Sequence, residues 1–259
     1  MRMFGFRRLL IVASALALLV PYSNTHWVAV VAARARATEE ITREFALTGG
    51  GRLVLQNGRG DISIQVWDRP AIELKAVKTL DMADAAPVSI DIRASNDEVD
   101  ISSPTPASVK NQRSTVDYQL RVPADIDVKL IKNARGRVQV TGITGRVIVQ
   151  VVNGDIRLTD CSGKLDAMTV NGQIDATFAR VDPGDSIKLE NYNGDIRLRL
   201  PASVNPHLEA RALAGAIHSV LPLAIQSVFG PQSAHQEGDP SAAFVSLVSV
   251  RGDIHISHR

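Results

Sequence analysis

The feature that most constrains this sequence is a glycine repeat in its second half. Each glycine is followed by a stretch in which apolar and polar residues alternate. The spacing is nine residues, at Gly136, Gly145, Gly154, Gly163 and Gly172. Nine residues make one strand and one turn. The region is therefore expected to be a series of short strands, with side chains alternating between two faces.

Two kinds of turn alternate along this repeat, so the structural unit is longer than nine residues. Asn-Gly corners at 153–154, 171–172 and 193–194 are separated by looser corners rich in Gly, Asp and Ser. A repeat of about 18 to 22 residues with two strands is one coil of a flattened solenoid. We therefore predict an all-β fold, a parallel β-solenoid (β-helix-like) built from such coils.

Aligning the coils on their glycines predicts which side chains face the core. Two positions after the glycine the column is entirely apolar: Val138, Ile156, Ile174, Ile196, Ile217 and Ile254. The next position forms a polar, outward column: Gln139, Arg157, Asp175, Arg197, His218 and His255. In a parallel stack such neighbours lie about 4.8 Å apart. The alternating charges of this column therefore favour parallel stacking. An antiparallel meander stays open, because Asn-Gly is also a strong hairpin signal.

The chain divides into three parts on these patterns. Residues 1–37 are predicted to be a signal peptide or an N-terminal anchor, and residues 126–259 hold the clear repeats, with a protruding loop inserted at 221–243. Residues 38–125 form a β segment expected to be continuous with the solenoid. Its strands are predicted at 52–56, 61–67, 72–78, 88–93, 98–102 and 115–122, with an edge or loop at 100–101 and over 102–114.

The N-terminal residues have the pattern of an export signal. Three arginines precede an apolar run from Leu9 to Val20, and Ala35-Arg36-Ala37 is a small-x-small cleavage site. We expect the mature chain to begin near Thr38, in the periplasm, the cell envelope or outside the cell. The long stretch from Pro21 to Arg34 leaves an uncleaved anchor as the alternative, and only in that case is a membrane partner expected.

Composition excludes several classes of protein. Aromatic residues make up 4% of the chain while 45% is hydrophobic, which indicates a thin aliphatic core. The five arginines of the leader account for the formal charge of +2, so the body from Thr38 onward is slightly acidic. Such a body is not expected to bind nucleic acid. Cys161 is the only cysteine, so no internal disulfide can form.

At this point the sequence resembles a known family, the bacterial "putative adhesins" with β-strand repeats, a domain of unknown function. The resemblance runs from about Phe45 onward. It rests on 57–64 with Trp67-Asp68 behind it, on Val122-Pro123, on the Asn-Gly-x-Ile series at 153–156, 171–174 and 193–196, and on 252–254. The resemblance implies a β-solenoid fold, a location at the cell envelope or surface, and the adhesive role after which the family is named. It defines no catalytic or binding residues. Gln173, Ala214-Gly215-Ala216 and the long insertion depart from the family pattern.

Candidate binding residues are few. Trp67 is the one aromatic side chain expected to offer a platform for a glycan, and Tyr192 is the second candidate, although packing is its default interpretation. Arg157, Asp175 and Arg197 complete the possible binding surface. No catalytic, cofactor-binding or metal-binding residue is predicted.

Three other patterns suggest chemistry but have structural interpretations. Asp61, Asp155, Asp195 and Asp253 share one column, and we interpret them as turn-stabilising groups that bond nearby backbone. Two of these aspartates belong to Arg-Gly-Asp tripeptides, which fall at the repeat's own turns. His218, His255 and His258 are interpreted as exposed strand residues, although the first two would share the outer column if the last two coils stacked directly.

The predicted function is therefore non-enzymatic: an exported adhesin or scaffold that binds an envelope protein or a glycan without a cofactor. The alternative is a carbohydrate-active enzyme on a parallel β-helix. Glycoside hydrolysis needs two carboxylates across a cleft, whereas the sequence shows carboxylates recurring at equivalent turns.

Overall fold

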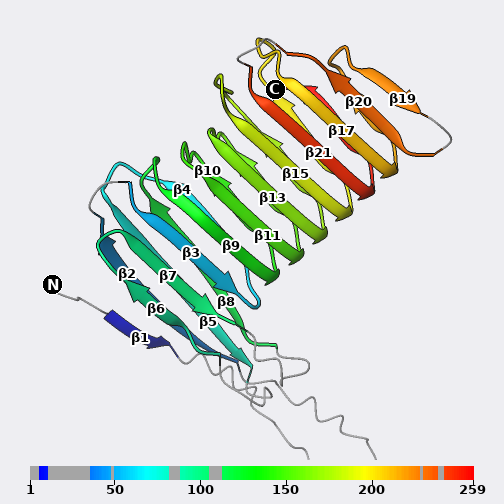
Figure 1. Ribbon diagram of the computed structural model, residues 1–259. Helices are drawn as coiled ribbons and strands as arrows, with labels where there is room; N and C mark the ends of the chain where they lie inside the picture. Colours follow the sequence, from blue (N-terminus) through cyan, green and yellow to red (C-terminus); the bar gives the residue numbers. More distant parts are fainter. Residues whose placement is uncertain are drawn as a thin grey trace, which may run out of the picture.

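The computed structural model describes residues 6–10, 36–47, 50–81, 88–104, 113–227, 230–238 and 242–259. Within these ranges the protein consists of 22 strands in two 11-stranded sheets, stacked along one long axis (Figure 1). The predicted all-β fold is confirmed, and both sheets are mostly parallel. No helix in the described part of the chain is long and apolar enough to cross a membrane.

The two strands of each repeat lie in different sheets. In spatial order sheet A contains β1 (Phe6–Leu10), β2 (Arg36–Ala46), β5 (Ala71–Asp81), β8 (Thr115–Val122), β4 (Ile62–Val66), β10 (Val138–Thr141), β12 (Ile156–Thr159), β14 (Ile174–Thr177), β16 (Ile196–Leu200), β22 (Ile254–His258) and β18 (Ile217–Ser219). Sheet B contains β19 (Ala224–Ser227), β20 (Gln232–Gln236), β17 (His207–Ala214), β21 (Phe244–Arg251), β15 (Ser186–Asn193), β13 (Lys164–Asn171), β11 (Val147–Asn153), β9 (Asp127–Arg135), β3 (Arg52–Asn57), β7 (Glu98–Ser103) and β6 (Asp91–Ala94).

The middle of the molecule is parallel and in register, as the column alignment predicted. Ile156 pairs with Val138 on one side and Ile174 on the other, and Ile174 pairs with Ile196. All six members of the predicted apolar column are buried. The antiparallel meander is therefore wrong for these coils. The period-two pattern places every second side chain between the two sheets, where the core lies.

The glycines of the Asn-Gly corners are required by close approach between coils. A Cβ on Gly172 would lie 2.1 Å from the carbonyl oxygen of Gly154, and a Cβ on Gly194 would lie 2.1 Å from that of Gly172. Both glycines also have positive φ, at 152° and 130°. The glycine column thus allows the corners to stack in contact.

The coils do not follow chain order at the ends. The red β21 lies between β15 and the yellow β17 in Figure 1, and β22 lies between β16 and β18. The last coil of the sequence is therefore inserted before the fifth one. At the other end β3 lies between β9 and β7, and β4 lies between β10 and β8, so the earlier strands are nearer the middle of the stack. A one-dimensional alignment cannot show such an exchange, because each coil presents the same edges.

The insertion at 221–243 corrects a prediction. Instead of a protruding loop, its described residues carry β19 and β20, an antiparallel hairpin that continues sheet B beyond β17. The open edge of β17 provides backbone donors and acceptors that the returning chain pairs. At the opposite end β6 pairs antiparallel with β7, and β5 pairs antiparallel with β2 and β8. Both ends of the molecule are capped in this way.

The strands predicted in the N-terminal β segment are present as β3 to β8, with β6 confined to Asp91–Ala94, whereas β2 was not predicted. Only part of the segment is parallel. β3, β4, β7 and β8 join the parallel coils, while β2, β5 and β6 form the antiparallel cap. Residues 105–112 of the expected edge or loop lie outside the described residues. So does most of the predicted leader, although β1 pairs antiparallel with β2.

Candidate functional site

The outer face of sheet B carries a row of apolar side chains across six neighbouring strands. Each of them is the residue two positions before an aligned glycine. The residues on either side of this position pair in register between neighbouring strands, so the side chains of the row lie side by side. This apolar row consists of Ala134, Val152, Val170, Tyr192, Val250 and Leu213. Because adjacent strands lie about 4.8 Å apart, the row is about 24 Å long.

The apolar row is exposed to an unusual degree for large aliphatic and aromatic side chains. Val152 is 41% exposed, Tyr192 49% and Leu213 47%, and Met168 on the next row is 36% exposed. The interpretation of Tyr192 as a packed residue is therefore wrong. It follows the buried Asn191 on β15, so strand alternation turns it outward. Exposed apolar side chains gathered in this way make the row a candidate interaction surface.

Polar groups border the apolar row on both sides. On the corner side Asn171 donates to the Oδ1 of Asn153 over 3.0 Å, and Asn193 donates to the Oδ1 of Asn171 over 2.8 Å. On the strand side Lys188 lies 2.9 Å from Glu190, whose hydrogen bond raises the pKa of the lysine. An apolar centre with a polar rim is the usual anatomy of a protein interface.

A buried polar row supports the apolar row from the core side. Thr169 donates to the carbonyl of Gly154 over 2.9 Å, Asn191 to that of Gly172 over 2.8 Å, and Ser249 to that of Gly252 over 3.0 Å. These bonds tie β13, β15 and β21 to the glycine corners, which fixes the direction in which the next side chain of each strand points. Sequence reasoning missed them, although their constant place three residues before the aligned glycine is a readable signal.

The charged part of the predicted surface lies elsewhere. Arg157, Asp175 and Arg197 are in register on β12, β14 and β16 of sheet A, so their column is confirmed. The ion pair that forms is diagonal, however: Arg199 Nη1 lies 2.5 Å from Asp175, while Arg197 bonds to Asp195 at 3.1 Å. The five predicted residues therefore do not make one surface, because this column and Tyr192 belong to different sheets.

Trp67 follows β4, at a corner of the molecule, and its ring is already occupied. The guanidinium carbons of Arg69 and Arg121 lie 4.7 and 4.8 Å from its centroid. Its Nε1 donates to the carbonyl of Ala71 over 2.7 Å. These cation–π contacts take the place that a sugar ring would need, so Trp67 is not a free glycan platform.

The aspartate column is a hydrogen-bonding ladder between coils. The Oδ1 of Asp155 accepts from the backbone N–H of Gln173 at 2.9 Å, and that of Asp195 accepts from Asp253 at 3.0 Å. Asp253 in turn accepts from Ala216 at 2.8 Å. Each carboxylate thus bonds the next coil rather than its own turn, which refines the predicted structural role. Asp117 does the same for Asp61, and sequence alignment did not include it.

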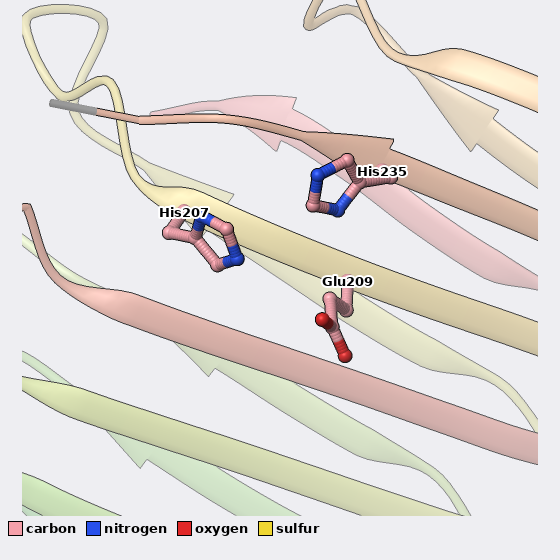
Figure 2. Close-up of side chains that lie close together, drawn as sticks. All are labelled: His207, Glu209 and His235. Carbon is pink, nitrogen blue, oxygen red and sulfur yellow. The ribbon is translucent and has the colours of Figure 1, made fainter. Parts of the chain in front are cut away.

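Histidines gather at the C-terminal end of the stack. His218 and His255 do stack, with centroids 4.9 Å apart, because β18 pairs directly with β22. A second cluster was not predicted: His207 and Glu209 on β17 lie beside His235 on β20 (Figure 2). The sequence signal, His-x-Glu on one strand face, was visible for two of them. His235 joins them only because β20 pairs with β17, in a segment that was expected to be a loop.

Other titratable groups are structural. Burial raises the pKa of the Cys161 thiol, which keeps it protonated and unreactive. Burial also raises the pKa of Tyr118 to about 12. A pocket of about 210 Å³ is lined by Gln56, Asp91, Arg93, Asp100 and Ser102.

The fold and the apolar row define a class, an elongated all-β repeat protein with a row of exposed apolar side chains on one sheet. Within that class the chain belongs to the Toastrack DUF4097 family, whose match covers residues 51–257. It is similar in structure to a "putative cell adhesion protein" from Clostridium sporogenes, with a TM-score of 0.53 and 14% identity over 86% of this chain and 100% of the other. A "putative adhesin" from Bacteroides fragilis gives a TM-score of 0.35 and 13% identity over 85% and 97% of the two chains. No curated protein sequence matches the chain.

Proposed function

We propose that this protein is a non-enzymatic, exported β-repeat module of the cell envelope or surface, an adhesin or scaffold that binds a protein or glycan partner. The observation that carries the proposal is the apolar row of sheet B. The repeating unit of the protein is a β-solenoid coil of about 18 to 22 residues. Each of six coils contributes one outward apolar side chain to the row. Export through cleavage near Thr38 is part of the same proposal.

The chemistry of the apolar row favours a protein partner over a glycan. Sugars are held by aromatic rings, and the row contains one ring, Tyr192, among five aliphatic side chains. Aliphatic side chains with a polar rim match a protein surface instead. The Asn-Gly corners keep the strands stacked, so little conformational entropy would be lost on binding.

The alternative function, a carbohydrate-active enzyme, lacks a comparable observation. Two carboxylates must face each other across a space that admits a sugar and water. The aspartates of the ladder use Oδ1 to bind backbone of the next coil. Their repetition at equivalent corners suits stacking, whereas catalysis needs unlike groups that converge once.

The proposal is tested by measuring how strongly beads that display the protein bind to immobilised envelope proteins and to a glycan array. The double variant Tyr192→Ser, Leu213→Ser should lose at least about tenfold in protein binding, since the two most exposed large apolar side chains of the row contribute more than about 1.4 kcal/mol together. The matched control is Arg157→Ser, an exposed change on sheet A, which should bind like the wild type.

Two outcomes would contradict the proposal. One is equal loss of binding in the Arg157 control, and the other is release of reducing sugar ends from any arrayed glycan by the wild-type protein. Sedimentation of the wild-type protein over a range of concentrations distinguishes a second copy of the chain from a foreign partner as the occupant of the row.

A further inference from the structure

A cluster of metal-ligating side chains lies where the C-terminal hairpin joins the last parallel strand. His207 and Glu209 lie two apart on β17, so they share one face, and Glu209 pairs in register with His235 of β20. Their ligand atoms all lie within 4.8 Å of one another. Figure 2 shows the two imidazole rings and the carboxylate gathered on the same side of the sheet.

From this geometry we propose that His207, Glu209 and His235 form a binding site for a zinc-class divalent transition-metal ion. Two imidazole nitrogens and one carboxylate oxygen suit Zn²⁺, whereas Ca²⁺ and Mg²⁺ prefer oxygen ligands alone. Around a tetrahedral ion with bonds of about 2.1 Å, ligand atoms lie about 3.4 Å apart. The present separations, up to 4.8 Å, are larger than this value, so the side chains would have to rotate about their bonds to close on the ion.

The surroundings hold the cluster ready for an ion. The His207 ring stacks on Phe244 of β21, with centroids 5.7 Å apart, and meets the His235 ring edge-on at 5.1 Å. No hydrogen bond or ion pair within the described part of the chain engages the three ligating groups. Their lone pairs are therefore available to a cation, and the Phe244 contact restricts the orientation of one ligand.

Three protein ligands leave one coordination position for water or for a partner's side chain. The ion would also join β20 to β17, so it would fasten the hairpin that caps sheet B. Leu213 of the apolar row lies on the same face of β17, four residues beyond Glu209. The metal site is thus next to the proposed interaction surface but is built from different residues.

The test is calorimetric titration of the full-length, tag-free protein with Zn²⁺ after removal of metal by a chelator. One saturable site per chain is expected. His207→Ala, His235→Ala and Glu209→Gln should each weaken binding at least about tenfold, since changes to groups that only support ligands already cost about that much. His218→Ala and His255→Ala, in the stacked pair on sheet A, are the matched controls and should bind Zn²⁺ like the wild type.

Backbone hydrogen exchange provides a second measurement that reports the position of the ion. Zn²⁺ should slow exchange in β20 and β17 of the wild-type protein, and this effect should be absent with Ca²⁺ or in the His235→Ala variant. The proposal is overturned if the wild-type protein shows no saturable Zn²⁺ binding, if the sheet A controls lose as much affinity as the site variants, or if protection appears in β22 and β18 instead.

Discussion

At the scale of single residues, the corner glycines show how local sequence and packing between coils are joined. Gly172 combines a positive φ with a carbonyl oxygen 2.1 Å from where its Cβ would be. Gly184 also has a positive φ, of 85°, but nothing lies within 4 Å of its missing Cβ. Substitution of Gly184 would therefore cost only the free energy of an unfavourable backbone conformation, whereas substitution of Gly172 would add a clash with the neighbouring coil.

This contrast leads to a prediction about stability. Gly172→Ala should lower the free energy of unfolding by at least about 3 kcal/mol, because backbone must shift in two coils. Gly184→Ala should cost about 1 kcal/mol, the conformational part alone. Denaturant midpoints of both variants measure the difference. Equal shifts of the two midpoints would show that contact between coils is not the reason why the corners require glycine.

The faces of a single strand give a second prediction at this scale. Ile174 is fully buried between the sheets, whereas the neighbouring Asp175 is half-buried and pairs with Arg199 on the outside. Ile174→Asp should cost several kcal/mol because a charge enters an apolar core. Asp175→Asn should cost about 1 kcal/mol or less. Urea denaturation of both proteins, side by side, tests the face assignment, which similar midpoints would contradict.

At the scale of elements, a buried polar chain connects the two sheets. Tyr118 of β8 donates to Ser103 of β7 over 2.8 Å, and Ser103 donates to the Oδ1 of Asn57 on β3 over 2.9 Å. Asn57 donates back to the carbonyl of Val116 over 3.0 Å. This closed set of bonds fastens sheet A to sheet B next to the N-terminal cap.

The raised pKa of Tyr118 makes stability depend on alkaline pH. The phenol has an ordinary pKa of 10.0 when unfolded and about 12 when folded, so the folded state holds the proton more tightly. Stability from this group is therefore complete below pH 10 and falls as pH rises to 12, by up to about 3 kcal/mol. Tyr118→Phe should remove that fall, at a cost of about 1 kcal/mol at neutral pH.

Thermal unfolding between pH 8 and 12 measures this effect. Tyr192→Phe is the control, since Tyr192 is exposed and should leave the alkaline profile unchanged. A Tyr118→Phe protein that loses stability as steeply as the wild type would assign the alkaline transition to other groups.

At the scale of the whole molecule, stability is spread over stacked coils with a cap at each end. A chain that begins at Thr38 lacks β1 and the first two residues of β2, yet it keeps every parallel coil. We expect it to fold, to give a β circular dichroism spectrum with negligible helix, and to keep that spectrum in a chelator. The proposed zinc ion fastens one hairpin, so its removal should change local exchange and leave the spectrum intact. Unfolding by the chelator, or substantial helix, would contradict this expectation.

Much of the fold could be predicted because its information is local. The two-residue period, the Asn-Gly corners and the glycine column each depend on neighbours in the chain or on one repeat beyond, so the buried column from Val138 to Ile254 was correct. The candidate site was predicted only in fragments. Tyr192 was named, but it was interpreted as packed because an apolar residue in a repeat suggests burial.

By itself, then, the sequence determined the strands and turns of the parallel coils and the columns of side chains that face their core. Only the tertiary structure decided the order of the coils, because every coil offers the same backbone edges and local pattern cannot rank them. The same holds for the hairpin on β17 and for the meeting of His207, Glu209 and His235. These features depend on which edge remains unpaired after the coils have stacked, and that is a property of the assembled sheet rather than of any segment.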